Sequence, residues 1–354
     1  MHGLSKAWIT LNRSCNLRCR WCYAAGTNYL ESETMDFLLA CELLDFVAAL
    51  EIKEVALLGG EPTCYDGLTE LVRYCRRIGI NCQLITNGIK LSDAEFVSRI
   101  AEAGVSCVDI SLKGFSAENY IAETGSDRYS QVMCAIKNVK SLGLPFSVSM
   151  VLSRNNIKGF IDGVRDAASS GANNFAFSFC HDFSALDAGD TNTEYSIQQN
   201  VLDVAAGFVN SYEELREATD DCFVLHQTFP FCIWEPNFIE LLRSRSQIFS
   251  SCQIFRRDGL IFDTEGRLIP CNFMHQVKLG RFKEDFSSLE EFASFWNSET
   301  IKQYYKAITT GSVPDEACLN NCPSWKLCGG GCLSNWYNYS FDKLQRAKAV
   351  REES

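Results

Sequence analysis

Between residues 7 and 180, short apolar stretches alternate with longer amphipathic ones, and this alternation constrains the fold more than any other feature. Six stretches have the length and composition of strands, at 7–11, 54–58, 81–86, 106–111, 146–152 and 174–180. Segments that suit helices separate them, at 34–50, 68–78, 93–103, 128–142 and 157–170. Strands that alternate with helices form parallel βαβ units. The pattern therefore predicts an α/β protein with too few units for a closed eight-stranded barrel.

Three cysteines, Cys15, Cys19 and Cys22, follow the first predicted strand with the spacing C-x3-C-x2-C. A [4Fe–4S] cluster has four corners and usually takes four cysteines. Three thiolates from this loop would leave one iron open to another ligand. Zinc requires four ligands, and no local fourth ligand stands near the loop. A disulfide would leave an odd thiol in a tight loop. The spacing therefore favours an iron–sulfur cluster with one open iron.

Glycine-rich or polar motifs stand at the ends of the next predicted strands. Gly59-Gly60-Glu61-Pro62 follows the second strand, Asn87 ends the third and Ser111 ends the fourth. In parallel α/β architectures, functional residues gather at the carboxyl ends of the strands. We therefore expect these motifs and the cysteine loop to converge on one mouth.

The cysteine loop, with Trp21 before its third cysteine and Gly-Gly-Glu-Pro about 40 residues later, resembles the radical S-adenosylmethionine (SAM) enzymes. The resemblance implies a partial (β/α)6 TIM-like barrel, open on one side. It also implies that SAM chelates the open iron, and that an electron from the cluster splits SAM to give a 5′-deoxyadenosyl radical. The cofactor-binding residues that it implies are Trp21, Tyr23, Gly59, Gly60, Glu61, Pro62, Asn87 and Ser111. Lys113 stands where the family usually has an aspartate.

A second group of cysteines lies in the C-terminal third. Cys252 and Cys271 flank a turn at 263–266 that predicts a β-hairpin, and Cys318, Cys322, Cys328 and Cys332 follow. The group resembles the SPASM domain, an extension that carries auxiliary clusters. The resemblance implies one auxiliary [4Fe–4S] cluster on Cys252, Cys271 and Cys332, and another on Cys318, Cys322 and Cys328.

Two departures from the SPASM pattern leave the number of auxiliary clusters at one or two. The first gap within 318–332 is three residues instead of two, and no cysteine follows Cys332 in the sequence. Cys232 is the candidate fourth ligand of the first set. A structural zinc module is the alternative for these close cysteines. We expect three regions: a radical SAM partial barrel at 1–190, a helical bridging region at 191–250 with helices near 192–216 and 237–246, and a SPASM domain at 251–354.

Composition limits the partners and the compartment. The net charge of −11 and the scattered basic residues disfavour nucleic acid. No apolar run is long enough for a membrane span, and no signal peptide is visible. Without a secretory signal, the 18 cysteines are expected to be metal ligands or buried thiols in a reducing compartment. A cytoplasmic protein without a membrane partner is therefore expected.

The resemblance implies an enzyme that abstracts a hydrogen atom from a substrate carbon. We expect it to modify a ribosomally made peptide, by a thioether or carbon–carbon cross-link or by epimerisation. An anaerobic sulfatase-type maturase, a small-molecule alcohol dehydrogenase and a non-catalytic iron–sulfur electron-transfer protein are the alternatives. An external electron donor such as flavodoxin or ferredoxin is expected. Since the first strand begins by residue 7, a separate leader-binding protein or the barrel surface would recognise a leader. The sequence assigns no catalytic acid or base.

Overall fold

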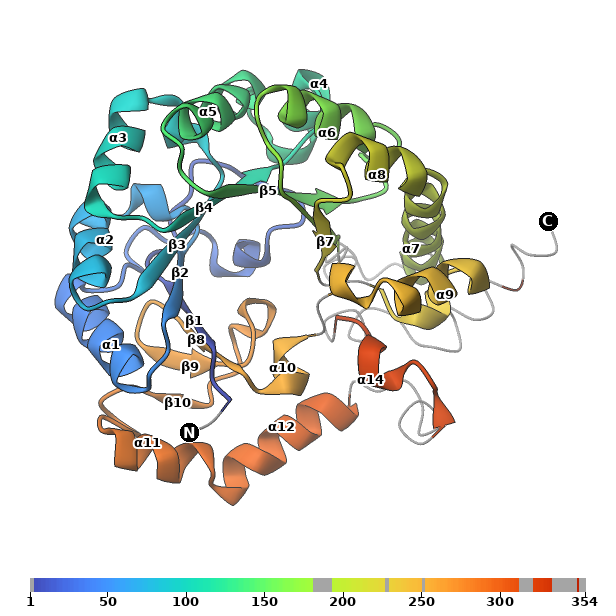
Figure 1. Cartoon of the computed structure of the whole chain (residues 1–354). Helices are drawn as coiled ribbons and strands as arrows, with labels where there is room; N and C mark the ends of the chain where they lie inside the picture. Colours follow the sequence, from blue (N-terminus) through green and yellow to red (C-terminus); the bar gives the residue numbers. More distant parts are fainter. Residues whose placement is uncertain are drawn as a thin grey trace.

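The computed structural model describes residues 3–180, 193–226, 229–249, 252–311, 321–332 and 349. One ten-stranded sheet, in the order β10-β9-β8-β1-β2-β3-β4-β5-β6-β7, organises this part of the chain. The sheet curves around a central space, and helices α1 to α6 cover its outer side (Figure 1). Within the described residues, no helix combines the length and the apolar character that a bilayer crossing requires.

The six predicted strands are confirmed, each with boundaries within one residue of the expected ones. All six pair in parallel with their sequence neighbours, because a helical segment separates each strand from the next. They are β1 (Lys6–Thr10), β2 (Glu54–Leu58), β3 (Asn81–Thr86), β4 (Cys107–Leu112), β5 (Phe146–Leu152) and β6 (Phe175–Phe179).

The sheet continues beyond these six strands at both edges. β7 (Phe223–Leu225) pairs in parallel with β6, and β8 (Gly259–Phe262) pairs in parallel with β1. β8 is also the first strand of the predicted hairpin, whose second strand is β9 (Arg267–Ile269). A short β10 (Gly280–Arg281) closes the edge. The C-terminal cysteine region is therefore attached to the strand that precedes the first cysteine loop.

Helices connect the parallel strands and bury one apolar face on the sheet. The first six are α1 (Phe37–Ala49), α2 (Leu68–Arg77), α3 (Ala94–Ala103), α4 (Ala117–Thr124), α5 (Tyr129–Ser141) and α6 (Phe160–Ser169). Side-chain caps fix several starts: Asp36, Asp93 and Ser116 each accept a backbone N–H bond from the first turn of their helix. α4 was not predicted from the sequence.

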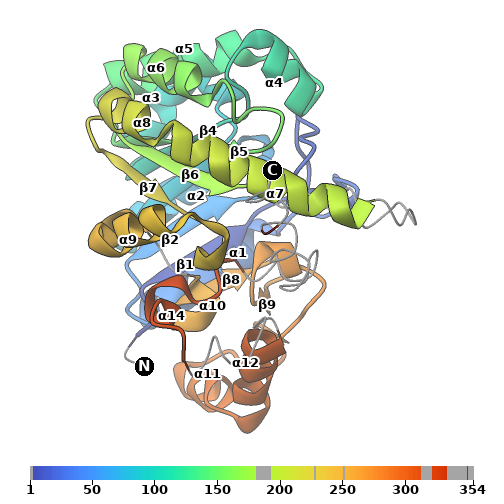
Figure 2. The ribbon, with the colours of Figure 1, turned by 90° about the vertical axis from the view of Figure 1, so that its right-hand side faces the viewer.

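The remaining helices occupy the bridging region and the C-terminal third. In place of the single predicted helix at 192–216 there are two, α7 (Thr193–Asn210) and α8 (Tyr212–Thr219). α9 (Pro236–Ser244) corresponds to the second predicted helix. The others are α10 (Gln253–Arg256), α11 (Leu289–Trp296), α12 (Glu299–Gly311) and α14 (Trp325–Cys328). Figure 2 shows α11 and α12 at the end of the molecule opposite α4, α5 and α6.

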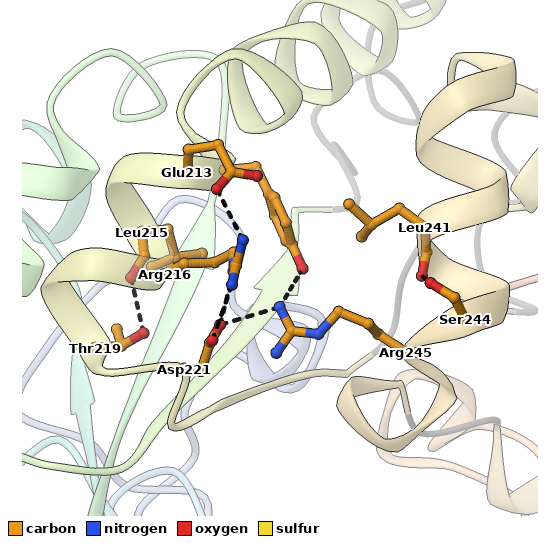
Figure 3. Close-up of polar contacts among 9 residues, drawn as sticks. Glu213, Leu215, Arg216, Thr219, Asp221, Leu241, Ser244 and Arg245 are labelled. Atoms are coloured by element: carbon orange, nitrogen blue, oxygen red, sulfur yellow. Dashed lines mark hydrogen bonds and ion pairs between the residues drawn. The ribbon is translucent and has the colours of Figure 1, made fainter.

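Aromatic packing holds the bridging region against the barrel, and a polar network joins two of its helices. Trp234, which is 1% exposed, packs edge-on against Phe179 of β6, with 5.3 Å between ring centroids. On the surface, Asp221 accepts hydrogen bonds from Arg216 at 2.9 Å and from Arg245 at 3.0 Å (Figure 3). Arg245 lies just after α9, so this network joins α9 to α8.

Short 3-10 helices mark the loops near the cysteines. They are η1 (Tyr23–Thr27), η2 (Pro62–Cys64), η3 (Ile89–Ser92), η5 (Phe231–Ile233), η6 (Ser246–Ile248) and η7 (Asn272–Met274).

Candidate metal and cofactor site

The first cysteine loop runs between the end of β2 and the end of α4. On the β2 side, the Gly60 N–H donates to Asn12 O and the Glu61 N–H donates to Ser14 O, both at 2.8 Å. On the α4 side, the Arg18 N–H donates to Thr124 O at 3.2 Å. The Arg20 N–H donates to Glu123 O at 3.0 Å in the same way. The backbone path of the loop is therefore fixed on two sides.

The three thiols of this loop gather in one half-buried place. Cys15 interacts electrostatically with both Cys19 and Cys22. Burial raises the pKa of the Cys15 thiol to about 12 and that of the Cys19 thiol to about 11, because desolvation disfavours the thiolate. Bound iron would supply the positive charge that such buried thiolates need, since a coordinating thiol is deprotonated.

The chemistry of these donors suits an iron–sulfur cluster. Three half-buried cysteine thiols stand on one loop, and cysteine thiolates are the ligands of [4Fe–4S] clusters. In a cubane cluster each thiolate binds a different iron, so three cysteines would leave the fourth iron to another ligand. Across the described ranges, no group of three His, Cys, Asp or Glu side chains is placed to hold one metal ion. The donor set therefore fits a [4Fe–4S] cluster.

Gly59 and Gly60 are required by the packing of the β2 end on the cysteine loop. A Cβ at Gly59 would come within 2.2 Å of Asn12 Oδ1. A Cβ at Gly60 would come within 2.3 Å of the carbonyl oxygens of Arg13 and Ser14. Both distances are below any real Cβ contact. The glycines thus allow two strand-end loops to pack in direct contact, a role that the sequence did not reveal.

The Glu61 carboxylate ties together the ends of β2 and β3. It is 1% exposed, and its Oε1 accepts bonds from the Thr63 N–H at 3.0 Å, the Thr63 hydroxyl at 2.7 Å and the Thr86 hydroxyl at 2.6 Å. Its Oε2 accepts from the Asn87 N–H at 2.7 Å. The side chain of Glu61 is therefore engaged by the protein itself.

Asn87 and Tyr23 bring two more of the predicted residues to the cysteine loop. The Asn87 amide donates to the Asn16 side chain at 2.7 Å, and the Tyr23 hydroxyl donates to Gly59 O at 3.0 Å. Burial raises the pKa of the Tyr23 phenol above its ordinary value. Trp21 is 9% exposed and packs in the core beside the loop.

The two remaining cofactor candidates have less direct links to the loop. Pro62 begins η2, immediately after Glu61. The hydroxyl of Ser111 pairs with that of Ser149 on β5 at 3.2 Å. Lys113, two residues beyond Ser111, interacts electrostatically with Cys19.

Two tyrosines near the thiols were missed by sequence reasoning. Tyr29 interacts electrostatically with Cys22, and the Arg18 guanidinium lies over its ring, 4.2 Å from the centroid. Tyr120 of α4 is completely buried and interacts electrostatically with Cys15 and Cys19. No motif or periodicity distinguishes these two aromatic residues in the sequence.

In the C-terminal third, the structure brings together the thiols of Cys252, Cys271 and Cys332. Cys252 precedes α10, Cys271 follows β9 and Cys332 follows α14, and the three interact electrostatically with one another. Burial raises the pKa of the Cys252 thiol to about 12 and also raises that of Cys271. These thiols come from segments that are distant in sequence, so the fold supplies the set.

Cys328 lies with Cys322 in a second group. Its sulfur accepts the Phe231 N–H at 3.2 Å, and the backbone of Gly330 and Gly331 lies near this sulfur, with the Gly331 N–H donating to Cys328 O at 2.8 Å. Cys318, the third predicted member, lies outside the described residues. Cys232 follows Phe231 directly, so this contact places it beside the Cys328 segment. Its assignment to the first auxiliary set stays a prediction.

The two cysteine regions touch each other. η7, which follows Cys271, packs on η1, which follows Cys22. The rings of Tyr23 and Phe273 meet edge-on with 5.7 Å between centroids. His275 lies against Gly26, where an added Cβ would be 3.3 Å from its ring.

Comparison with known proteins assigns the N-terminal part. Residues 9–167 match the radical SAM superfamily. The chain is similar to a protein of Sulfolobus acidocaldarius named "Probable GTP 3',8-cyclase", with 32% identity over 168 residues, 46% of this chain and 51% of that protein. The chain thus matches about half the length of this curated relative.

The overall fold is similar to that of two proteins of known structure. The structure "Native anSMEcpe with bound AdoMet" has a TM-score of 0.68 at 19% identity, and the match covers 98% of this chain and 97% of that one. Streptococcus suis SuiB bound to precursor peptide SuiA has a TM-score of 0.64 at 16% identity, with 97% and 76% covered. At these identities the likeness shows the fold alone.

Proposed function

Because residues 9–167 are a radical SAM domain, we propose that this chain cleaves SAM reductively at the Cys15–Cys22 loop and abstracts a hydrogen atom from a peptide. A [4Fe–4S] cluster bound there would supply the electron that splits SAM into methionine and a 5′-deoxyadenosyl radical. The observation that carries the proposal is the convergence of three half-buried thiols with the Gly59–Pro62 segment, through paired 2.8 Å backbone bonds.

Each group of residues would have a defined task. Cys15, Cys19 and Cys22 would hold three irons. The backbone of Gly59 to Glu61 would bind the methionine part of SAM, while the Glu61 carboxylate keeps the strand-end loops in place through its four hydrogen bonds. Buried aromatic walls around the loop would exclude water, so that a reactive radical meets only its target.

A second task falls to the C-terminal cysteines. Cys252, Cys271 and Cys332 would hold one auxiliary cluster, and Cys322 and Cys328 would contribute to another. The Phe231 N–H donates to the Cys328 sulfur, with the backbone of Gly330 and Gly331 nearby, and hydrogen bonds to cluster sulfurs raise a reduction potential. An auxiliary cluster in this place could accept an electron from a substrate radical and pass it toward an external donor–acceptor protein such as flavodoxin or ferredoxin.

The peptide is favoured as substrate by the extent of the structural match. The fold likeness to SuiB, solved with its precursor peptide, includes 97% of this chain and therefore its C-terminal cysteine region. The anSMEcpe fold has also been solved with the Kp18Cys peptide. Cyclisation of GTP is the second candidate, favoured by the 32% identity to the protein named as a GTP 3',8-cyclase.

The test is SAM cleavage by anaerobically reconstituted protein. With dithionite as reductant, we expect 5′-deoxyadenosine from the wild type and none from the triple variant Cys15→Ala, Cys19→Ala, Cys22→Ala. Cys134→Ala is the matched control, since Cys134 is exposed on α5. Production of 5′-deoxyadenosine by the triple variant at the wild-type rate would overturn the proposal.

A second arm separates the two substrate candidates. The protein is incubated with SAM and either GTP or a library of short cysteine-containing peptides, and products are identified by mass spectrometry. Loss of two hydrogen atoms, or an epimerised residue, in a peptide supports the proposed substrate. Conversion of GTP to an isomer of the same mass would instead establish the cyclase function.

A further inference from the structure

Tyr120 has a buried hydroxyl with no hydrogen-bond partner in the described part of the chain. Its side chain is 0% exposed, and its hydroxyl oxygen is one of the few buried side-chain oxygens there that are left unpaired. Leaving a buried hydroxyl unpaired costs about 1–3 kcal/mol. Such a group is rare in folded proteins and calls for an explanation, for example a bound group that the polypeptide does not supply.

The Tyr120 hydroxyl lies near the first cysteine loop. Its helix, α4, contacts this loop, and the phenol interacts electrostatically with Cys19, Cys15 and Glu61. Of these groups, Glu61 is already satisfied, because its two carboxylate oxygens accept bonds from Thr63, Thr86 and Asn87. Cys19 and Cys15, which would carry the cluster, are therefore the neighbours left to pair with the hydroxyl.

The position of Tyr120 is set by close packing rather than by a flexible loop. The turn between β4 and α4 packs so tightly on its backbone that a Cβ at Gly114 would come within 2.4 Å of the Tyr120 Cα. The end of the same helix receives the N–H groups of Arg18 and Arg20 from the cysteine loop. The helix and the loop are therefore held together by backbone hydrogen bonds, and the position of Tyr120 beside the loop is built into the fold.

We infer that the Tyr120 hydroxyl donates a hydrogen bond to a sulfur of the cluster that Cys15, Cys19 and Cys22 hold. The inference rests on the proposed function in one respect, because it requires a cluster at this loop. A hydrogen bond to a cluster sulfur stabilises the more negative, reduced cluster, and so raises its reduction potential. Tyr120 is thus a positioning residue that sets the driving force for SAM cleavage.

The experiment compares Tyr120→Phe with Tyr129→Phe. Tyr129 is the matched control because its ring contacts that of Tyr120 at 6.3 Å, while its hydroxyl donates to Asp166 at 2.8 Å, away from the loop. The reduction potential of the cluster at the first cysteine loop is measured by a redox titration that is monitored by electron paramagnetic resonance. The signal used is the one that changes when SAM is added. We expect a negative shift in Tyr120→Phe and none in Tyr129→Phe. An unchanged potential in Tyr120→Phe would overturn the inference.

Urea denaturation of iron-free protein supplies a second readout. Removing a hydroxyl that has no protein partner should leave iron-free Tyr120→Phe at least as stable as the wild type. A fall in its urea midpoint as large as that of Tyr129→Phe would show a protein partner and overturn the inference. If the proposed function is wrong, the SAM-sensitive signal should persist in the triple variant Cys15→Ala, Cys19→Ala, Cys22→Ala. This result differs from an unchanged potential in Tyr120→Phe, so the two failures can be told apart.

Discussion

The Glu61 carboxylate offers the sharpest test of how the mouth of the barrel is built. Glu61→Gln keeps the size of the side chain but replaces one oxygen by an NH2 group. In the wild type, the Asn87 N–H donates to Glu61 Oε2 at 2.7 Å. In the variant, the amide oxygen faces Thr63 and Thr86, so the NH2 group faces the Asn87 N–H and two donors oppose each other. A hydrogen bond to a charged group contributes about 1.5–3 kcal/mol, and the three bonds at Oε1 also lose their charge. We therefore expect a loss of about 2–4 kcal/mol in the free energy of unfolding.

The assay is urea denaturation of iron-free protein, followed by circular dichroism. Glu70→Gln is the control, since Glu70 pairs with Arg73 on the surface of α2 at 3.2 Å, and exposed ion pairs contribute about 0–1 kcal/mol. If Glu61→Gln unfolds at the same urea concentration as Glu70→Gln, the carboxylate does not hold the strand-end loops. Its role would then be direct binding of the cofactor, as the family resemblance implies.

Three further predictions test separate parts of the structure. Gly60→Ala should lose about 1–3 kcal/mol of stability and much of its iron, because its Cβ would meet backbone oxygens at 2.3 Å. Gly159→Ala is the control, since a Cβ there meets open space, and it should match the wild type in urea denaturation and iron content. Burial raises the pKa of Asp109, so its charge destabilises the fold increasingly as pH rises above the ordinary pKa of about 4. Asp109→Asn should therefore have a higher urea midpoint than the wild type at neutral pH and lose this gain in acid. An equal gain at both pH values would refute this. Cys271→Ala and Cys328→Ala should each lose about four irons, and the double variant about eight; a double variant with the iron content of either single variant would place both thiols on one cluster.

The strands were predictable because their signal is local. Each βα unit carries an apolar run bounded by turn residues, and these runs match the observed strands within one residue. β7 has only three residues, too few for any pattern to emerge. The parallel pairing of β8 with β1 joins residues about 250 positions apart, and nothing in either segment signals it. Sequence reasoning therefore found the hairpin but not its place in the barrel sheet.

The candidate site was predictable to the extent that it consists of motifs. The cysteine spacing and the Gly-Gly-Glu-Pro segment could be recognised in the sequence, and the structure brings them together. The engagement of Glu61 could not be predicted, because its partners Thr86 and Asn87 come from a different strand end. Tyr120 was missed for a related reason. α4 has only eight residues, which is too short for a clear helical period, and its end is held by backbone hydrogen bonds from the cysteine loop.

Tyr23 connects the two cysteine regions. It interacts electrostatically with Cys22 and Cys15 of the first loop and with Cys271 of the C-terminal region. β1 brings these regions together, because it leads into the first loop and also pairs with β8 of the hairpin that leads to Cys271. The Tyr23 ring meets that of Phe273 edge-on, and its hydroxyl donates to Gly59 O at 3.0 Å. One side chain therefore contacts both the segment after Cys271 and the end of β2, a contact that neither cysteine motif signals in the sequence.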